Sequence, residues 1–246
     1  MIFNILKNKI THEKETDLRQ EYLKVKKNDN IYGFQKKFYK QSNRLLKVFG
    51  NARNKLPNSI RLIIITDTHN MLDESQLIEV VKKHSNYDLC ILLGDHSDTD
   101  IQKVIKYIPR EKLYALLGNH DINYIDNYKL NNLNGKIINI NGVKILGIQG
   151  SFKYKPVDFP SFTQEESIKF LLNKEQADIL ISHDGPFDDN MINKPAHQGL
   201  FGITYYLYKN KVKYNIHGHL HNNYERVLNN NTIEKCVIGV NYLELE

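Results

Sequence analysis

Tryptophan is absent from this 246-residue sequence, and cysteine occurs only twice. Long apolar runs are also missing, because none approaches the roughly 20 residues that a helix needs to cross a bilayer. Together with a mean hydropathy of -0.51, these absences argue against a membrane protein. The first residues include Lys7 and Lys9 and offer no small-residue cleavage site, so a secretory signal is not expected.

The two cysteines, Cys90 and Cys236, stand far apart in the sequence, each inside an apolar run typical of a strand. This placement favours buried thiols over a disulfide or a pair of metal ligands. Free thiols fit a reducing compartment, and we therefore expect a cytoplasmic protein.

Charge is unevenly distributed along the chain, whose net charge is +6 at pH 7. Residues 1–61 contain 15 lysines and arginines against 5 acidic residues, a net of +10. Residues 62–246 contain 19 against 23, a net of -4. The basic character that would suggest a nucleic-acid partner therefore belongs to the first quarter of the chain alone.

We expect residues 1–58 to form a basic helical extension with a linker, and residues 59–246 to form the main domain. Two interpretations of the extension stay open. It is either an arm that binds nucleic acid or, as we favour, an amphipathic cover packed on the main domain, since charged runs usually face solvent. The apolar residues at helical spacing that would pack in the second case are Phe34, Phe38, Leu45 and Phe49.

After Arg61 the sequence changes to short apolar runs that alternate with amphipathic segments. Strands are expected at residues 61–66, 88–94, 112–118, 178–182 and 213–219. Helices are expected at residues 74–84, 100–107, 163–173 and 199–209. Such alternation predicts parallel βαβ units. An Asn141-Gly142 turn predicts one antiparallel hairpin, and a second hairpin around Asn229–Asn231 is expected to close the chain, so the sheets should be mixed.

Polar side chains follow the carboxyl ends of five of these strands, and sites of α/β proteins form at such ends. We expect all of them in one crevice: Asp67, His69, Asp95, Asp98, Asn119, His120, Asp121, His183, His219 and His221. Carboxylate oxygens and imidazole nitrogens without thiolates suit Mn, Fe, Ni or Zn. More than six candidate ligands would over-supply one ion, whereas two ions sharing a bridging carboxylate account for the number.

Taken in order, these residues form five blocks that resemble the motifs of the calcineurin-like metallophosphoesterases, specifically the small bacterial and phage-type branch. The blocks are DxH at Asp67, GDxxD at Asp95, GNHD at Asn119, a single His183 after a strand, and GHxH at His219. The resemblance covers residues 61–246. It implies an α/β fold, a four-layer α/β/β/α sandwich of two mixed sheets flanked by helices.

The resemblance also implies two divalent metal ions and a role for each residue. Asp67, His69 and His221 would bind the first ion, and Asn119, His183 and His219 the second. Asp95 would bridge both, and a hydroxide between the ions would attack phosphorus. His120 would contact the phosphate or protonate the leaving group. Asp121 would orient the His120 ring, and Asp98 would support a ligand without binding metal itself.

Three functions remain open. The favoured one is a metal-dependent hydrolase of phosphodiesters or phosphomonoesters. The others are a nuclease whose basic extension binds nucleic acid, and a metal-binding scaffold without activity. Protein phosphatases of the family have GNHE where this chain has GNHD, which makes that branch unexpected. His96 and His197 are candidate substrate contacts, and His217 is expected to pack in the interior.

Overall fold

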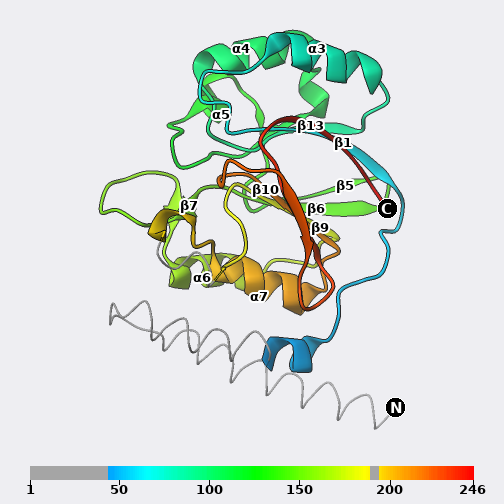
Figure 1. Cartoon of the computed structure of the whole chain (residues 1–246), viewed down its shortest axis with the longest axis vertical. Helices are drawn as coiled ribbons and strands as arrows, with labels where there is room; N and C mark the ends of the chain where they lie inside the picture. The colour runs from blue at the N-terminus through cyan, green and yellow to red at the C-terminus, as the bar shows by residue number, and fades with distance from the viewer. Residues whose placement is uncertain (1–43, 189–193) are drawn as a thin grey trace.

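The computed structural model describes residues 44–188 and 194–246, and Figure 1 shows two β-sheets facing each other between two layers of helices. The first sheet has the order β13 (Gly239–Leu245), β1 (Ile60–Thr66), β2 (Leu89–Leu92), β3 (Leu113–Ala115), β4 (Asn131–Asn132). The second has the order β11 (Tyr224–Val227), β12 (Ile233–Cys236), β10 (Tyr214–His217), β9 (Ile179–Ser182), β6 (Val143–Ile148), β5 (Ile137–Ile140). A separate small sheet pairs β7 (Ser151–Phe152) with β8 (Ser161–Phe162).

Helices cover the outer face of each large sheet (Figure 1). The helices at the first sheet are α3 (Glu74–Lys83), α4 (Asp98–Tyr107) and α5 (Tyr124–Asn127), with the 3-10 turn η1 (Arg110–Lys112). Those at the second sheet are α6 (Gln164–Leu172) and α7 (Phe201–Asn210), preceded by the 3-10 turn η3 (Pro195–His197). The predicted four-layer α/β/β/α sandwich is confirmed. Within the described residues, no helix has the length and apolar character that spanning a bilayer requires.

Both sheets are mixed, as the sequence predicts. β1 to β4 run parallel, and β6, β9, β10 and β12 also run parallel. The Asn141-Gly142 turn joins β5 to β6, with φ angles of 52° and 86° at its two residues. Both angles are left-handed, as a two-residue hairpin turn of this kind requires.

The end of the chain differs from the prediction. β11 and β12 form the expected hairpin, but β13 leaves it and crosses to the first sheet. There it pairs antiparallel with β1 over the whole of that strand, from Ile60 opposite Leu245 to Thr66 opposite Gly239. A hairpin signal identifies neighbouring strands in sequence, and it carries no information about a strand that continues into another sheet.

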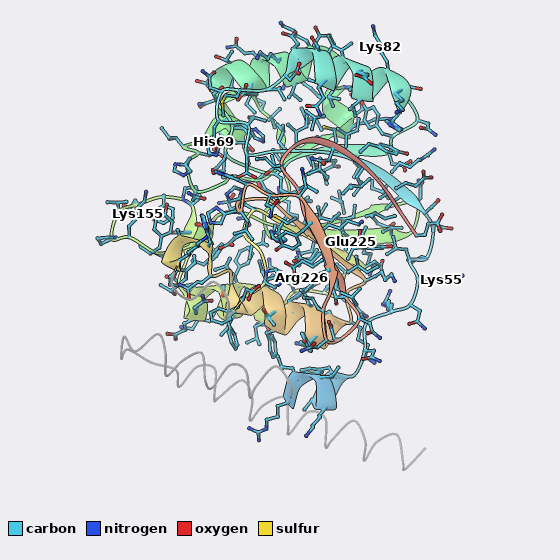
Figure 2. The ribbon with its side chains drawn as sticks, in the orientation of Figure 1. Lys55, His69, Lys82, Lys155, Glu225 and Arg226 are labelled. Carbon is cyan, nitrogen blue, oxygen red and sulfur yellow. The ribbon has the colours of Figure 1, made fainter. Side chains whose placement is uncertain are left out.

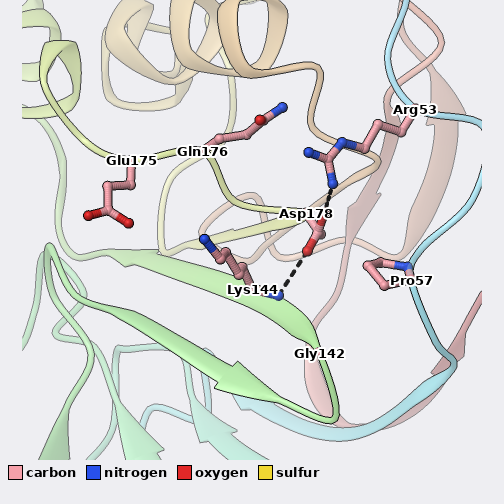
Figure 3. Close-up of a pocket in the computed structure, with 7 residues that line it drawn as sticks. All are labelled: Arg53, Pro57, Gly142, Lys144, Glu175, Gln176 and Asp178. Carbon is pink, nitrogen blue, oxygen red and sulfur yellow. Dashed lines mark hydrogen bonds and ion pairs between the residues drawn. The ribbon is translucent and has the colours of Figure 1, made fainter.

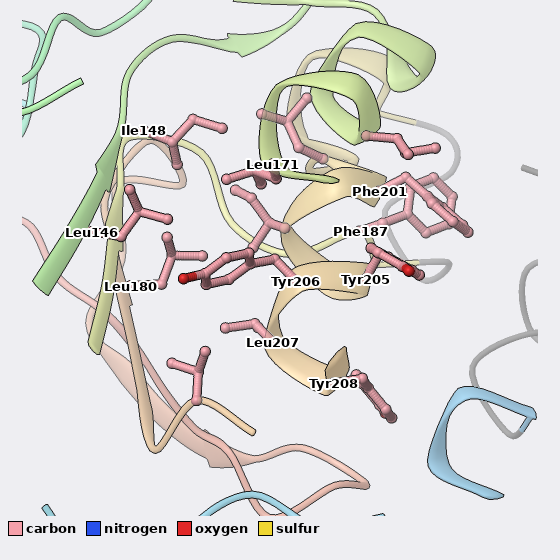
Figure 4. Close-up of a cluster of buried hydrophobic side chains, with 14 of the residues drawn as sticks. Leu146, Ile148, Leu171, Leu180, Phe187, Phe201, Tyr205, Tyr206, Leu207 and Tyr208 are labelled. Atoms are coloured by element: carbon pink, nitrogen blue, oxygen red, sulfur yellow. The ribbon is translucent and has the colours of Figure 1, made fainter. Parts of the chain in front are cut away.

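Three clusters of buried apolar side chains fill the spaces between the layers. One lies between the two sheets and contains branched aliphatic side chains of β1, β2, β9 and β10, for example Ile64, Ile91 and Ile181. Another joins the first sheet to α3 and α4. The third joins the second sheet to α6 and α7, and Figure 4 shows Tyr206 and Leu207 of α7 directed toward Leu180.

The segment before β1 is attached to the main domain at two places. Residues 44–49 are helical, and Leu45 and Phe49 are buried in the α7 cluster, where the Phe49 ring meets Tyr205 edge-on at 6.1 Å. This contact agrees with the predicted amphipathic cover for the part of the extension that is described. Phe34 and Phe38 lie outside the described residues, so their packing and the nucleic-acid arm stay predictions.

The second attachment is an ion pair between Arg53 and the buried carboxylate of Asp178. It borders a pocket of about 340 Å³ at the amino ends of β6 and β9 (Figure 3). Lys144 and Glu175 also line this pocket, so charges of both signs surround it. The predicted functional residues follow the opposite, carboxyl ends of the strands, so the pocket is separate from them.

Gly202 provides a test of how α7 packs against α6. A methyl group at this glycine would overlap the backbone of Ser167 in α6. In an isolated helix, Gly→Ala stabilises by about 1 kcal/mol. Here we expect Gly202→Ala to lower the free energy of unfolding by about 1–3 kcal/mol because of overpacking. Chemical denaturation measures this change, and a variant as stable as the parent protein would contradict the close helix contact.

Candidate metal centre

The predicted ligands converge at the carboxyl ends of five parallel strands, as expected. The side chains of Asp67, His69, Asp95 and His221 form one group whose ligand atoms all lie within 4.8 Å of one another. A second group satisfies the same limit and consists of Asp95, His183 and His219. Asp95 belongs to both groups. The structure thus brings together residues from turns that follow β1, β2, β9 and β10.

Within the first group, two imidazole nitrogens face each other, with His69 Nε2 at 3.1 Å from His221 Nε2. His221 Nε2 is also 3.4 Å from Asp67 Oδ1. Figure 2 places His69 at the side of the molecule where the loop with Lys155 projects, away from Lys55. Three potential ligands are therefore close enough for one cation to contact all of them.

In the second group, His183 Nε2 lies 3.6 Å from Asp95 Oδ2 and 3.1 Å from Asn119 Oδ1. Asn119 joins this group although it follows a different strand, β3. Asp95 Oδ2 is also 3.7 Å from His69 Nε2, so the same oxygen faces both groups. This is the position that a bridging carboxylate would take.

Two carboxylate oxygens test whether the site fits a cation. Asp67 Oδ1 and Asp95 Oδ2 are buried and have no hydrogen-bond partner among the described residues. The other oxygen of each accepts a backbone N–H, from His219 to Asp67 Oδ2 at 2.9 Å and from His120 to Asp95 Oδ1 at 2.8 Å. A buried charged oxygen without a partner is costly. Both oxygens point into the groups of imidazole nitrogens, so divalent cations fit the residues that are present.

Backbone carbonyls fix the rings of two of the histidines. His183 donates from Nδ1 to the carbonyl of Leu93 at 2.8 Å, which leaves Nε2 facing Asp95. His219 donates from Nε2 to the carbonyl of Ala196 at 2.6 Å, which leaves Nδ1 for the site. Histidines that bind metal characteristically donate their other ring N–H in this way, and the bond sets both tautomer and orientation.

The charges of the site favour a cation. Burial raises the pKa of Asp95, but the neighbouring His183 and the backbone N–H of His120 together lower this pKa below its usual value. Burial lowers the pKa of His183, but the charge of Asp95 raises this pKa above its usual value. Burial lowers the pKa of His219, which keeps this ring neutral and able to bind metal. Asp95 is therefore an anion whose field attracts positive charge.

Five of the candidate ligand residues have a left-handed backbone, with φ of 53° at Asp67, 43° at His69, 59° at Asp95, 65° at His219 and 50° at His221. For residues other than glycine, such a conformation costs about 1–3 kcal/mol and persists only where surrounding contacts hold it. Glycine meets the same need at Gly94, where φ is 97° and where a Cβ would lie 2.7 Å from His183 Nδ1.

A buried carboxylate holds the turn that carries Asp67 and His69. Asp100 accepts hydrogen bonds from the Thr68 hydroxyl at 2.8 Å, from the Asn70 N–H at 2.7 Å and from the Leu72 N–H at 3.1 Å. Asp98, for which the sequence predicted a supporting role, is exposed in the first turn of α4. The helix begins two residues earlier than expected, with Ser97 as its N-cap, and this register turns Asp100 rather than Asp98 toward the site.

Asp121 holds the turn that carries Asp95. Its carboxylate accepts the backbone N–H groups of Asp95 at 2.7 Å, His96 at 2.9 Å and Gly118 at 2.6 Å. Both Asp121 oxygens accept backbone N–H groups of other residues, so the orientation of the His120 ring by Asp121 stays a prediction. The His120 side chain is exposed and lies edge-on to His69, with ring centroids 5.5 Å apart.

Three other residues near the centre differ in their surroundings. His96 donates from Nδ1 toward Thr68 Oγ1 at 2.8 Å and packs edge-on against Tyr124, so it lies behind the Asp67 turn. The His197 ring meets His219 edge-on at 5.1 Å. Tyr154, which the sequence did not single out, places its hydroxyl 3.4 Å from Asn119 Nδ2. No motif marks this tyrosine, since it lies in a loop after β7.

His217 is buried, as predicted, and it is paired with Glu234. Burial lowers the pKa of His217, but hydrogen bonds with Cys236 and Glu234 raise this pKa to about 10. Burial raises the pKa of Glu234, but hydrogen bonds from His217 and Arg226 lower this pKa to about 2. Glu234 was not identified from the sequence. The alternation of β12 places it on the same face as buried Cys236, and this signal would have identified it as an interior residue.

Comparisons with known proteins agree with this geometry. A family model described as calcineurin-like phosphoesterase matches residues 60–223. An uncharacterized protein from Haemophilus influenzae is 24% identical over 200 residues, which is 66% of this chain and 84% of that protein.

Two solved structures resemble the fold. The protein TT1561 of Thermus thermophilus has a TM-score of 0.54 at 9% identity, covering 74% of this chain and 90% of its own. A putative 5'-nucleotidase from Staphylococcus aureus, solved in complex with alpha-ketoglutarate, has a TM-score of 0.51 at 16% identity. That match covers 77% of this chain and 51% of the nucleotidase. At these identities the two structures show a shared fold alone.

The two aspartates of α4 form a matched pair for testing the support of the Asp67 turn. Asp100→Asn replaces a carboxylate that accepts from three donors of this turn, and we expect it to destabilise the protein by about 2 kcal/mol or more. Asp98→Asn changes an exposed side chain and should alter stability by less than about 0.5 kcal/mol. Urea unfolding of both variants measures the difference. Equal effects would contradict the assignment of support to Asp100.

Proposed function

Since this chain belongs to the calcineurin-like phosphoesterase family, we propose that it hydrolyses phosphomonoesters or phosphodiesters with two divalent metal ions. The observation that carries the proposal is the carboxylate of Asp95, which belongs to both groups of ligand atoms. Its unpartnered Oδ2 faces His69 on one side and His183 on the other. One buried carboxylate that belongs to both groups of ligand atoms favours a pair of cations over a single one.

We assign Asp67, His69 and His221 to the first ion, and Asn119, His183 and His219 to the second, with Asp95 shared. The distances among Nε2 and carboxylate or amide oxygens support the assignment of the other residues, and His219 is included because its ligand atom lies within 4.8 Å of those of Asp95 and His183. Neither cysteine takes part, because Cys90 and Cys236 are buried within strands β2 and β12. A donor set of oxygen and nitrogen without thiolate suits Mn, Fe, Ni or Zn.

When bound, such ions supply a hydroxide nucleophile at neutral pH and neutralise charge on the phosphoryl oxygens. The chain itself provides the exposed imidazole of His120 beside His69. The N–H of His120 donates to Asp95 Oδ1, which anchors the backbone of this residue to the shared carboxylate. The ring is therefore held at the rim of the site, where it can bind the phosphate or give a proton to the departing oxygen.

The first test is activity with added metal. We expect metal-stripped protein to hydrolyse generic monoester or diester substrates after addition of Mn²⁺, Ni²⁺, Zn²⁺ or Mg²⁺. Asp95→Asn should lower kcat/KM by more than about 100-fold, because it removes the anion that both ions would share. Asp98→Asn, on an exposed position close in sequence, is the matched control and should retain activity. Folded protein that shows no turnover with any of these ions would contradict the proposal.

The second test separates the two roles of His120. Loss of a proton donor slows reactions with poor leaving groups, whereas nitrophenolate leaves without protonation. We expect His120→Gln to lower kcat/KM about 100-fold or more for an alkyl phosphoester and much less for the nitrophenyl ester of the same phosphate class. Steady-state kinetics on the two substrates gives the ratio. An equal loss on both would assign His120 to phosphate binding instead.

A further inference from the structure

A buried ion pair lies directly behind the turn that carries His219 and His221. His217, the last residue of β10, and Glu234 of β12 are both fully buried, with His217 Nε2 at 3.0 Å from Glu234 Oε1. The other ring nitrogen, Nδ1, donates to the carbonyl of Gly218 at 3.0 Å. A Cβ at Gly185 would lie 2.8 Å from this ring, so the ring is also confined from the side of the loop after β9. His217 thus fixes the peptide group immediately before His219.

Glu234 receives further hydrogen bonds. The Tyr224 hydroxyl donates to its Oε1 at 2.8 Å, and Arg226 donates from Nε to Oε2 at 2.8 Å and from Nη2 to Oε1 at 3.1 Å. Tyr224 and Arg226 belong to β11 and His217 to β10, so the donors to Glu234 come from the two strands beside β12. Placing ions in the interior rarely adds stability over apolar packing, but a fully satisfied network does define one geometry.

Arg226 extends the network to a second route toward His219. Its Nη1 donates to Asp188 Oδ2 at 2.6 Å. The Asp188 N–H donates to the carbonyl of Gln198 at 2.9 Å, next to η3. The carbonyl of Ala196 in η3 accepts the ring N–H of His219. One guanidinium therefore connects the strand side of His219, through Glu234 and His217, with the loop side, through Asp188.

We propose that Arg226 and Glu234 are positioning residues for the metal centre, which hold the His219–His221 turn in its ligand geometry. This inference rests on the proposed metal-dependent function. His219 and His221 have left-handed backbones, and His219 depends on the carbonyl of Ala196 for its orientation. Residues that orient ligands commonly change metal affinity by about 10–100-fold when they are replaced. Loss of this network should therefore weaken metal binding before it unfolds the protein.

The experiment measures metal binding directly. Arg226→Met removes the guanidinium and keeps much of the side-chain volume, and Glu234→Gln keeps the shape of the side chain but removes its charge. The matched control is Arg61→Met. Arg61 also pairs with a carboxylate, Asp88, and its side chain is 31% exposed against 38% for Arg226, but it lies at the start of β1. Titration calorimetry with Mn²⁺ and elemental analysis after dialysis report affinity and content, and thermal unfolding without metal reports the fold.

For Arg226→Met and Glu234→Gln we expect the Kd for Mn²⁺ to rise at least about tenfold, while the control keeps the affinity of the parent protein. Arg226→Lys should recover part of the loss, because an ammonium retains the charge without the two-sided geometry. Folded variants that bind Mn²⁺ within about twofold of the parent protein, or a control that weakens binding equally, would overturn the inference. If Glu234→Gln fails to fold, Arg226→Met decides alone. A folded parent protein that binds no metal would instead overturn the proposed function.

Discussion

Backbone N–H groups that donate into buried carboxylates hold the functional end of this protein together. The turns after β1, β2 and β10 contain candidate ligands with a left-handed backbone, a conformation that is strained in residues other than glycine. Asp100 and Asp121 stabilise two of these turns by collecting their N–H groups, and Asp67 and Asp95 do the same for the backbone of His219 and His120. Two of the candidate ligands, Asp67 and Asp95, thus also support the turns of the site.

This arrangement gives the carboxylates of the site two different chemical tasks. Asp100 and Asp121 have their oxygens occupied by hydrogen-bond donors. Asp67 and Asp95 each have one oxygen, Oδ1 of the first and Oδ2 of the second, that has no partner among the described residues and would be available to a cation. Aspartate therefore has two roles at this end of the molecule. Some of its oxygens accept hydrogen bonds from the strained turns, and others concentrate negative charge beside the imidazole nitrogens.

Much of this could be predicted from the sequence, because strand ends, turn glycines and ligand types are local signals. The five blocks with Asp67, Asp95, Asn119, His183 and His219 fell where the structure brings them together. Asp98 and Asp100 show where local patterns fail: choosing between them requires the first residue of a helix, and an error of two residues turns the wrong side chain inward. Asp121 was expected to orient a neighbouring ring, whereas two of its three backbone partners, Asp95 and His96, lie in a turn 26 and 25 residues away in sequence. Tyr154 and Arg226 make contacts between segments that no spacing in the sequence connects.

The placement of β13 has a consequence for how the protein acquires its reactive end. β1 leads directly to Asp67 and His69, yet its edge is completed by β13, the last strand of this domain to be made. Thr66 of β1 pairs with Gly239, more than 170 residues further along the chain. During synthesis, one row of backbone groups of β1 therefore stays unpaired until β13 has been made. The arrangement of the candidate metal centre consequently depends on the whole domain. A nascent chain that lacks β13 also lacks the strand that pairs with β1, which leads to the turn with Asp67 and His69.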